Sequence, residues 1–439
     1  MKNQATFRFK PFSPRQQKVL TWWLPNSPVR DMDGFIADGA IRSGKTVSMS
    51  LSYVMWAMEC FNGQNFGMAG KTIGSFRRNV LFWLKLMLRS RGYRYEDHRS
   101  DNLLIVQRND RENYFYIFGG KDERSQDLIQ GITLAGMFFD EVALMPQSFV
   151  NQATGRCSVE GSKFWFNCNP EHPEHWFRKE WILQHQQKRL LYLHFTMEDN
   201  WSLSEKIKER YRAMYTGVFF KRFILGLWAV AEGLIYQLYV EAPERFAIAR
   251  DKLPRDENTG RYLFRYILIG VDFGGNKSKH AFAATAIDDD WRHVYVLKTK
   301  KIPAAGVSVE QLIRDFEVFA GEIERDYGEI DYVYPDNAEQ TIINSMAQST
   351  KYRILGCYKG EIIDRIRCTD ILMSTGRLHL VDGECDSLDS AFKQAVWDDK
   401  KAKDVRLDDG SYDVDPLDSF EYTISPYMRQ LGGIGENED

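Results

Sequence analysis

The stretch Gly39-Ala40-Ile41-Arg42-Ser43-Gly44-Lys45-Thr46 decides the fold of the first half of this 439-residue chain. It matches G-x-x-x-x-G-K-[ST] in full, with a strand pattern before it and a helix pattern after it. The two glycines let backbone N–H groups wrap phosphates, Lys45 places a cation against the β- and γ-phosphates, and Thr46 offers a hydroxyl to Mg²⁺. The pattern therefore predicts an ATP and Mg²⁺ site formed by Gly39, Arg42, Ser43, Gly44, Lys45 and Thr46.

Two later stretches are the natural partners of this loop. The apolar run Leu134–Phe139 ends in Asp140 and Glu141. Asp140 is expected to hold Mg²⁺ through its water shell, and Glu141 to orient or deprotonate the attacking water. The run Lys163–Asn167 is a further strand that ends in polar residues, so Asn167 and Asn169 are candidates for sensing the γ-phosphate. The alternative for these two is an asparagine turn before a proline.

Arginines are the candidates for stabilising the charge of the transition state. Arg42, inside the loop, can contact the γ-phosphate, and we assign it a catalytic role. Arg124 and Arg156 are further candidates, acting in the same subunit or in a neighbour. For these two, an ordinary surface arginine is the competing interpretation.

The order of strands and helices indicates two α/β domains. Strands are expected near 35–37, 66–69, 113–118, 134–139 and 163–167, with helices at 47–60 and 76–89, which favours a largely parallel sheet covered by helices. The texture of the sequence changes around 231–260, where 242–245 and 254–260 are polar, turn-rich stretches. We therefore predict a first domain at 1–235, a linker at 236–260 and a second domain at 261–439. The second domain should open with three adjacent strands, followed by a helix at 309–327, a strand at 332–334 and a helix at 338–349.

In the second domain, aspartates lie at the ends of predicted strands and at the start of a predicted helix. Asp272 ends the strand that begins at Tyr266, Asp336 follows a second strand, and Asp415 and Asp418 open a helix near the C-terminus. Carboxylates from two strand ends and one helix can converge on two divalent ions, which clamp the attacking and leaving oxygens in phosphodiester cleavage. The alternative is structural: strand-end aspartates start turns, and Asp415 can be an N-cap with Pro416 as the first helical residue.

Composition narrows the class of protein only a little. The chain is 44% hydrophobic and 27% charged, with a formal net charge of -3, which neither indicates nor excludes a nucleic-acid partner. No run of about 18 apolar residues is present, so no membrane span is expected. Six scattered cysteines do not form a disulfide framework and favour a reducing cytoplasm.

The loop GAIRSGKT, the strand and acids MFFDE, the segment FNCNP and the three spaced acids together resemble the terminase large subunits of tailed phages. The resemblance implies an N-terminal P-loop NTPase domain of the ASCE type, followed by an RNase H-like, RuvC-like nuclease domain. It implies that Asp272, Asp336 and Asp418 are the catalytic metal ligands, that Asn169 lies in a coupling motif, and that Gln16 or Gln17 contacts adenine. Asp415 stands where some relatives carry histidine.

The resemblance also implies a function and its partners. The chain would use ATP to translocate double-stranded DNA into a procapsid, and would cut concatemeric DNA with Mg²⁺ or Mn²⁺. Its partners would be DNA, the portal protein and a small terminase subunit. It would form a pentameric ring on the portal and be a monomer in solution. It would be located in the host cytoplasm, would bind the procapsid only transiently and would be absent from the mature virion.

Two questions stay open at this point. The competing function is a P-loop DNA helicase or translocase whose C-terminal domain binds without catalysis. The densest basic and aromatic run, Arg77-Arg78 with Lys85–Arg99, can track DNA phosphates or be a solvated helix face with interleaved acids.

Overall fold

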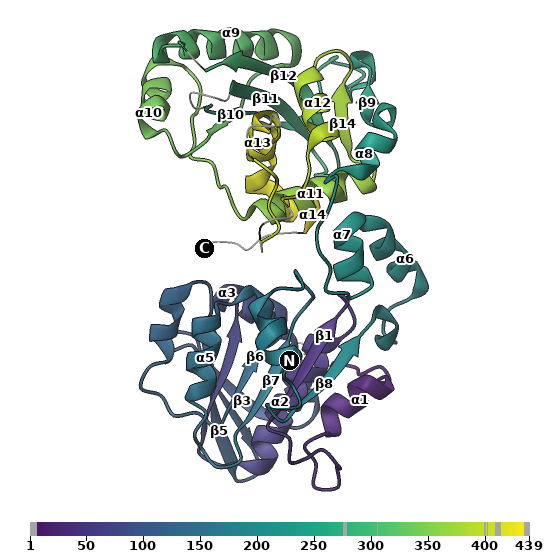
Figure 1. The fold of residues 1–439 in the computed structure, drawn as a ribbon, viewed down its shortest axis with the longest axis vertical. Helices are drawn as coiled ribbons and strands as arrows, with labels where there is room; N and C mark the ends of the chain where they lie inside the picture. The colour runs from purple at the N-terminus through teal and green to yellow at the C-terminus, as the bar shows by residue number, and fades with distance from the viewer. Residues whose placement is uncertain are drawn as a thin grey trace. The chain divides into compact units, whose positions relative to one another are not determined.

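The computed structural model describes residues 7–274, 279–304, 306–398, 401, 403–408 and 414–433. The chain divides into two compact units (Figure 1). Of the described residues, the first unit contains 7–212 and Val218–Val230, and the second contains Ala213–Gly217 and those from Ala231 to Gly433. None of the helices in the described part of the chain is both long and apolar enough to cross a membrane.

The first unit is built on an eight-stranded sheet with the order β3-β4-β5-β2-β6-β7-β1-β8. Its strands are β1 (Gly34–Gly39), β2 (Asn65–Gly70), β3 (Arg94–His98), β4 (Leu103–Arg108), β5 (Arg111–Gly119), β6 (Gly136–Phe139), β7 (Lys163–Asn167) and β8 (Leu190–Phe195). From β5 to β8 every neighbouring pair is parallel, whereas β3, β4 and β5 pair antiparallel. The carboxyl ends of β1, β6 and β7 therefore meet at one edge of the sheet.

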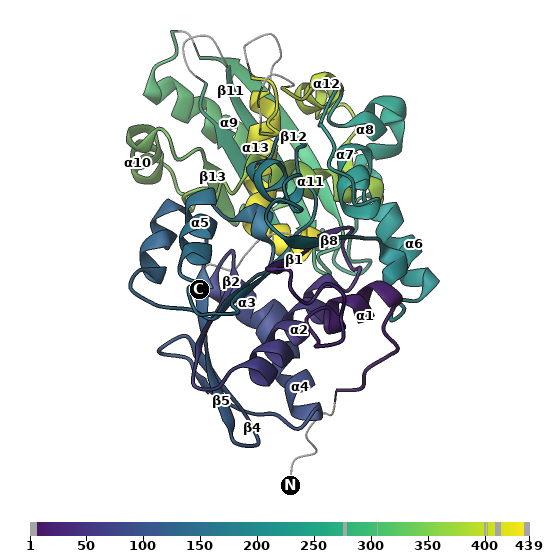
Figure 2. The ribbon, with the colours of Figure 1, turned by 60° about the horizontal axis from the view of Figure 1, so that its bottom comes forward.

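Helices cover both faces of this sheet. The main ones are α1 (Pro14–Thr21), α2 (Lys45–Cys60), α3 (Ile73–Phe76), α4 (Phe82–Ser90) and α5 (Gln147–Gly155). Two further helices, α6 (Glu205–Met214) and α7 (Gly217–Phe219), follow β8 along the chain. Figure 2 shows α1, α2 and α4 gathered together, and they share one core with Trp165, while α5 packs into a second core around Phe166. The helix predicted at 76–89 is interrupted by a π-helical turn, Arg77–Leu81, before α4 begins. Because α2 is buried nearly all round, it stands inside the unit and holds the loop before it in place.

The second unit has a six-stranded sheet with the order β13-β10-β11-β12-β14-β9. Its strands are β9 (Ala247–Ile248), β10 (Phe264–Asp272), β11 (Lys279–Asp288), β12 (Val294–Pro303), β13 (Tyr332–Pro335) and β14 (Leu378–Val381). The three central strands form the expected antiparallel meander. The main helices are α8 (Gln237–Glu241), α9 (Val309–Tyr327), α10 (Gln340–Ser349), α11 (Ile362–Ser374), α12 (Asp386–Gln394), α13 (Asp415–Ile424) and α14 (Met428–Gly432).

The segment predicted to be a linker, 236–260, folds with the second unit. It carries α8 and β9, and β9 pairs with β14, with Ala247 opposite Leu380. A two-residue strand in turn-rich sequence has no periodicity to reveal it. The short segment Ala213–Gly217 also belongs to this unit: the Thr216 amide and hydroxyl donate to the buried Asp370 carboxyl at 3.2 and 2.5 Å.

Helix α13 lies directly on β10 because a glycine makes room for it (Figure 1). A Cβ atom added at Gly270 would stand 1.8 Å from the backbone oxygen of Ser419. The N-cap of α13 is Val414, so the interpretation of Asp415 as the N-cap is wrong by one residue. The Asp415 carboxylate instead accepts the Lys279 amide at 2.9 Å. The close approach brings Asp418 towards the end of β10, where Asp272 lies.

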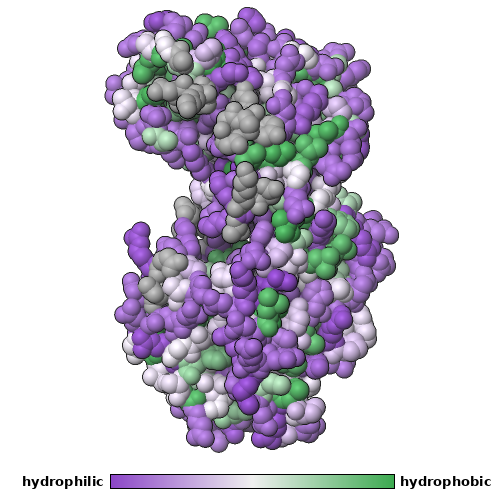
Figure 3. All heavy atoms as spheres, in the orientation of Figure 1, coloured by the Kyte–Doolittle hydropathy of each residue, from purple (hydrophilic) through white to green (hydrophobic). Residues whose placement is uncertain are grey.

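The face shown in Figure 3 is mostly hydrophilic, with its apolar residues in small groups. All six cysteines are free thiols, and four of them are buried.

Candidate functional site

The loop after β1 has the backbone that its glycines predict. Gly39 has φ 126°, and a Cβ there would stand 2.0 Å from the backbone oxygen of Phe195. Gly44 has φ 84° and is the N-cap of α2, which begins at Lys45. Left-handed φ values and close backbone approach both require glycine. The amino end of α2 therefore opens onto the loop, as a phosphate site needs.

The Lys45 ammonium is buried inside the loop, and within the described part of the chain its four hydrogen bonds go to neutral oxygens. It donates to the carbonyls of Gly39 (3.0 Å) and Ala40 (2.7 Å), and to the side chains of Ser43 (3.3 Å) and Asn169 (3.2 Å). Burial lowers the pKa of Lys45 to about 8, against the opposing effect of nearby anionic groups, Asp38 and Asp140 among them. A phosphate placed here would stabilise the charged form of this lysine.

Three side chains meet beside the lysine: one directly follows β6, one ends β7 and one lies in the first turn of α2. The Thr46 hydroxyl donates to Asp140 Oδ1 at 3.0 Å, and the Asn167 amide donates to Thr46 Oγ1 at 2.8 Å and to Asp140 Oδ1 at 2.5 Å. Burial, and then the neighbouring Glu141, raise the pKa of Asp140 to about 7. A divalent cation between Thr46 and Asp140 would favour the ionised carboxylate.

The remaining residues predicted for this site are placed differently. Gln16 is buried and its amide lies 3.4 Å from the Ser43 carbonyl, whereas Gln17 is exposed and donates to the Phe12 carbonyl. Glu141 follows Asp140 with φ 58°. Arg42 is in the left-handed region, φ 57°, and its guanidinium lies 5.3 Å from the centre of the Tyr211 ring.

The other two arginines lie on secondary-structure ends. Arg124 is exposed in the short helix that Asp122 caps, and Arg156 is the C-cap of α5.

The carboxylates of the second unit are close enough to influence one another. Asp272 is buried at the end of β10, and its Oδ1 accepts the Tyr422 hydroxyl at 3.1 Å. Burial raises the pKa of Asp272 to about 8, and the charges of Asp418, Asp415 and Asp336 add to the effect in that order. Asp336 follows β13, and its backbone amide donates a hydrogen bond to the Val271 carbonyl at 2.8 Å. The fold therefore brings together the four acids that the sequence singled out.

Cations of the protein hold two of these acids. Asp418 Oδ1 lies 2.7 Å from Arg365 and 2.9 Å from Arg406. Burial alone would raise the pKa of Asp418, but these two guanidiniums outweigh it and lower the pKa. Both arginines also reach Glu421, one turn further along α13, and Lys359 pairs with Asp336.

The donor set fits a hard divalent ion, although the side chains would have to move to bind it. Four carboxylates offer only oxygen ligands, which Mg²⁺ and Mn²⁺ prefer. As they stand, no three His, Cys, Asp or Glu side chains in the described residues are grouped closely enough to hold a metal. The hydroxyl, guanidinium and ammonium partners explain this spacing, because each orients a carboxylate towards itself.

Several residues of these two sites carry no signal of their own in the sequence. Lys359, Arg365 and Arg406 lie in separate segments that only the fold brings to Asp336 and Asp418. Glu421 and Tyr422 could have been found, because they lie three and four residues after Asp418 on a predicted helix. Asn167 could have been preferred to Asn169 as the neighbour of Asp140, because it ends a strand that pairs with β6.

Three cations of the basic run have partners within the run. Asp97 accepts Arg77 and Lys85, each at 2.8 Å, and Arg89 donates to the Tyr95 hydroxyl at 2.7 Å.

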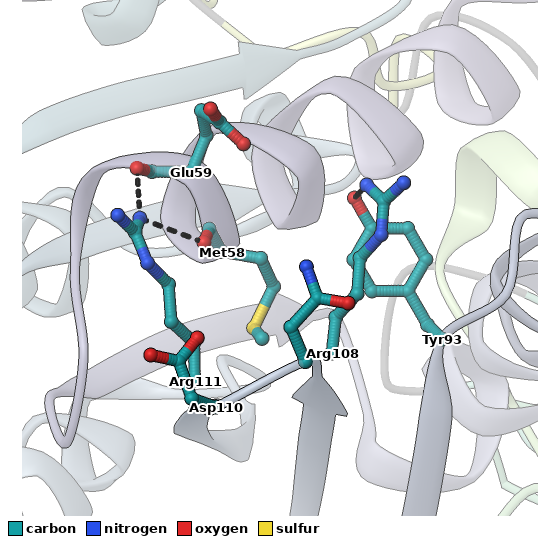
Figure 4. Close-up of a pocket in the computed structure, with 7 residues that line it drawn as sticks. Met58, Glu59, Tyr93, Arg108, Asp110 and Arg111 are labelled. Atoms are coloured by element: carbon teal, nitrogen blue, oxygen red, sulfur yellow. Dashed lines mark hydrogen bonds between the residues drawn. The ribbon is translucent and has the colours of Figure 1, made fainter.

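Beside this run, a cavity of about 330 Å³ lies at the far end of α2 (Figure 4). Its Arg111 donates to the last carbonyls of α2, at Met58 and Glu59, so it closes a helix end rather than offering a site.

Comparisons with known proteins show which family the whole chain resembles. The model of the N-terminal part of the terminase large subunit, T4-like virus type, matches residues 36–240. The large terminase of a thermophilic bacteriophage is 43% identical, with a TM-score of 0.83 over 95% of this chain and 100% of that one. The structure of that terminase with ADP is 41% identical, with a TM-score of 0.79 over 95% of this chain and 100% of that one. The structure with ATP-gamma-S is 42% identical, with a TM-score of 0.78 over 94% of this chain and 99% of that one. No curated protein sequence matches. The chain belongs to the family of phage terminase large subunits.

Proposed function

We propose that this chain hydrolyses ATP to translocate double-stranded DNA into a procapsid, and that it cuts concatemeric DNA with a two-metal nuclease. The observation that carries the proposal is the presence of two separate centres in one chain. One is a phosphate loop with Lys45 and a Thr46–Asp140–Asn167 cluster, and the other is a group of four carboxylates around Asp272. Each centre matches one of the two activities.

For the first centre, the complexes of the thermophilic phage terminase with ADP and with ATP-gamma-S support nucleotide binding by this chain, and we place the nucleotide at the loop Gly39–Thr46. Lys45 would exchange its carbonyl partners for phosphate oxygens, with Asn169 beside it. Thr46 and Asp140 would hold Mg²⁺, and Glu141 would orient the attacking water. Gln16, buried against the loop, would lie beside the base, and Arg42 would leave Tyr211 for the γ-phosphate.

In the second centre, Asp272, Asp336 and Asp418, with Asp415 beside them, would hold Mg²⁺ or Mn²⁺. The ions would activate water and stabilise the leaving oxygen. The protein's own part is orientation: Tyr422 fixes Asp272, and Arg365 and Arg406 fix one oxygen of Asp418. The arginines also keep Asp418 ionised, which a metal ligand requires.

Membership of the family supports a proposal about the partners. We propose that the chain assembles as a pentameric ring on the portal protein of a procapsid, and that a small terminase subunit recognises the DNA. In solution it would be a monomer, in the host cytoplasm, joining the procapsid only for packaging. The ring would give Arg124 or Arg156 a neighbouring active site to act on.

The test uses the full chain in two assays. ATP hydrolysis is measured with and without linear DNA, and supercoiled plasmid is incubated with Mg²⁺, Mn²⁺ or EDTA. The proposal expects both hydrolysis and metal-dependent cutting. Hydrolysis without cutting under any metal would favour the alternative, a P-loop helicase or translocase with a non-catalytic C-terminal domain.

Asn167→Ala is expected to lower the ATP turnover number about tenfold to a hundredfold, as the loss of a side chain that orients metal ligands does. The reason is that Asn167 holds Thr46 and Asp140 together. Turnover is measured at saturating ATP over a range of Mg²⁺ concentrations, with the exposed Asn151→Ala as the matched control. Equal turnover for the two variants would exclude an orienting role.

A further inference from the structure

The loop Leu355–Gly360 brings a lysine onto one of the nuclease acids. Lys359 Nζ pairs with Asp336 Oδ1 and lies 5.5 Å from the centre of the Tyr422 ring. Tyr422 in turn donates to Asp272, so the ammonium stands among the residues of the carboxylate site. Nothing in the proposed two-metal chemistry uses this cation.

Hydrogen bonds from Asn337 hold this loop in place. The Asn337 side chain donates to the Cys357 carbonyl at 2.6 Å and accepts the Cys357 amide at 2.9 Å. Gly356 leaves room for this contact, because a Cβ there would stand 3.3 Å from Asn337 Oδ1. Asn337 directly follows Asp336, so the two-way hydrogen bond keeps the lysine beside that carboxylate.

Lys359 differs from the other cations of the site in its exposure. The side chains of Arg365 and Arg406 are 8% and 1% exposed, whereas that of Lys359 is 40% exposed. The two arginines are buried and each bridges Asp418 and Glu421, so they stay with their acids. A half-exposed lysine on a four-carbon stem can exchange partners at little cost, because exposed ion pairs contribute only about 0–1 kcal/mol.

We propose that Lys359 is an exchangeable cation: it holds Asp336 until a divalent ion takes that carboxylate, and it then contacts a phosphate of the DNA strand to be cut. The inference rests on the proposed nuclease function and adds a DNA-contacting residue to it. Charge explains both halves. Lys359 and the metal compete for one carboxylate, and once displaced, the ammonium remains next to the place where the phosphate must bind.

The test compares Lys359→Met and Lys359→Arg with the wild type in the full chain. Lys351→Met is the matched control, because Lys351 also pairs with a carboxylate, Glu324, and lies 5.3 Å from a tyrosine ring centre. Mn²⁺ binding is measured by calorimetry without DNA. Duplex DNA binding is measured against salt concentration, once with Ca²⁺ and once with EDTA.

Two opposite effects are expected from Lys359→Met. Mn²⁺ should bind about twofold to fivefold more tightly, because a competitor worth up to about 1 kcal/mol is removed. With Ca²⁺, the negative slope of the logarithm of the DNA-binding constant against the logarithm of the salt concentration should become shallower by about 0.9. That change corresponds to the loss of one phosphate contact. With EDTA the slope should match the wild type, because Lys359 then stays on Asp336. Lys359→Arg should restore the slope with Ca²⁺.

Other outcomes overturn the inference in distinguishable ways. If the wild type binds Mn²⁺ and cuts DNA, but Lys359→Met binds Mn²⁺ no more tightly and keeps its salt slope, Lys359 is only a surface ion pair and the nuclease proposal stands. A slope that falls equally with EDTA would mean a permanent DNA contact without exchange. If the wild type neither binds Mn²⁺ nor cuts, both proposals fail together.

Discussion

Lys45→Ala is expected to lower the ATP turnover number about a thousandfold, since charge stabilisation of a transferring phosphoryl group is worth at least that much. The ammonium is buried in the loop and is held there by two backbone carbonyls and two side chains. Turnover is measured by phosphate release with Mg²⁺ and saturating ATP.

The matched control is Lys206→Ala, which removes an exposed lysine from α6 and should leave turnover unchanged. Metal-dependent plasmid cutting by Lys45→Ala should persist, because the carboxylate site belongs to the other unit. A melting temperature close to that of the wild type would show that the loop has not unfolded. Retention of a tenth of the wild-type turnover would refute the assignment of Lys45 to the phosphates.

Asp272→Asn is expected to reduce Mn²⁺-dependent DNA cutting about a thousandfold, which corresponds to roughly 4 kcal/mol of lost metal-assisted stabilisation. Asparagine keeps the size of the side chain and the contact with Tyr422, so what is lost is the negative charge that draws the metal. The initial rate of plasmid nicking measures the effect, and Asp290→Asn, an exposed acid of the β11–β12 turn, is the control. Undiminished nicking by Asp272→Asn would remove this acid from the site.

The same substitution has a second signature in the absence of metal. The pKa of Asp272 is raised to about 8 in the folded chain, above the ordinary value of an aspartate. Folded Asp272 therefore holds a proton that the unfolded chain has released, so its contribution makes stability fall as pH rises from about 4 to about 8. In EDTA, the melting temperature of Asp272→Asn should fall less than that of the wild type between pH 5 and pH 8. A steeper fall in the variant would contradict the raised pKa.

Sequence motifs predicted the fold class and many of its strands and helices, and the fold brings the predicted acids of the second unit close together. The fold class, a P-loop NTPase domain followed by an RNase H-like domain, and the family itself are confirmed. The helix expected at 309–327 has the same bounds in the structure. These features are local: a glycine loop, a buried strand and an amphipathic helix each leave a pattern within a few residues.

What the sequence could not predict depends on long-range contacts. Strand β3 reads as charged and polar because it lies at the sheet edge, with Arg94, Glu96 and His98 exposed. Arg365 and Arg406 are 53 and 12 residues from Asp418, and no periodicity links arginines to an acid at those distances. The roles of the individual site residues stay predictions until the variants are measured.

The division of the chain into interleaved segments limits how the gene can be cut into pieces. A fragment that starts at residue 261 would lack Thr216, which donates a hydrogen bond to the carboxyl of Asp370. Burial raises the pKa of Asp370 to about 6. The fragment would also lack β9, leaving β14 as an uncovered edge able to pair with other chains. A nuclease fragment that folds and stays soluble should therefore start before Ala213, or carry a designed replacement for both contacts.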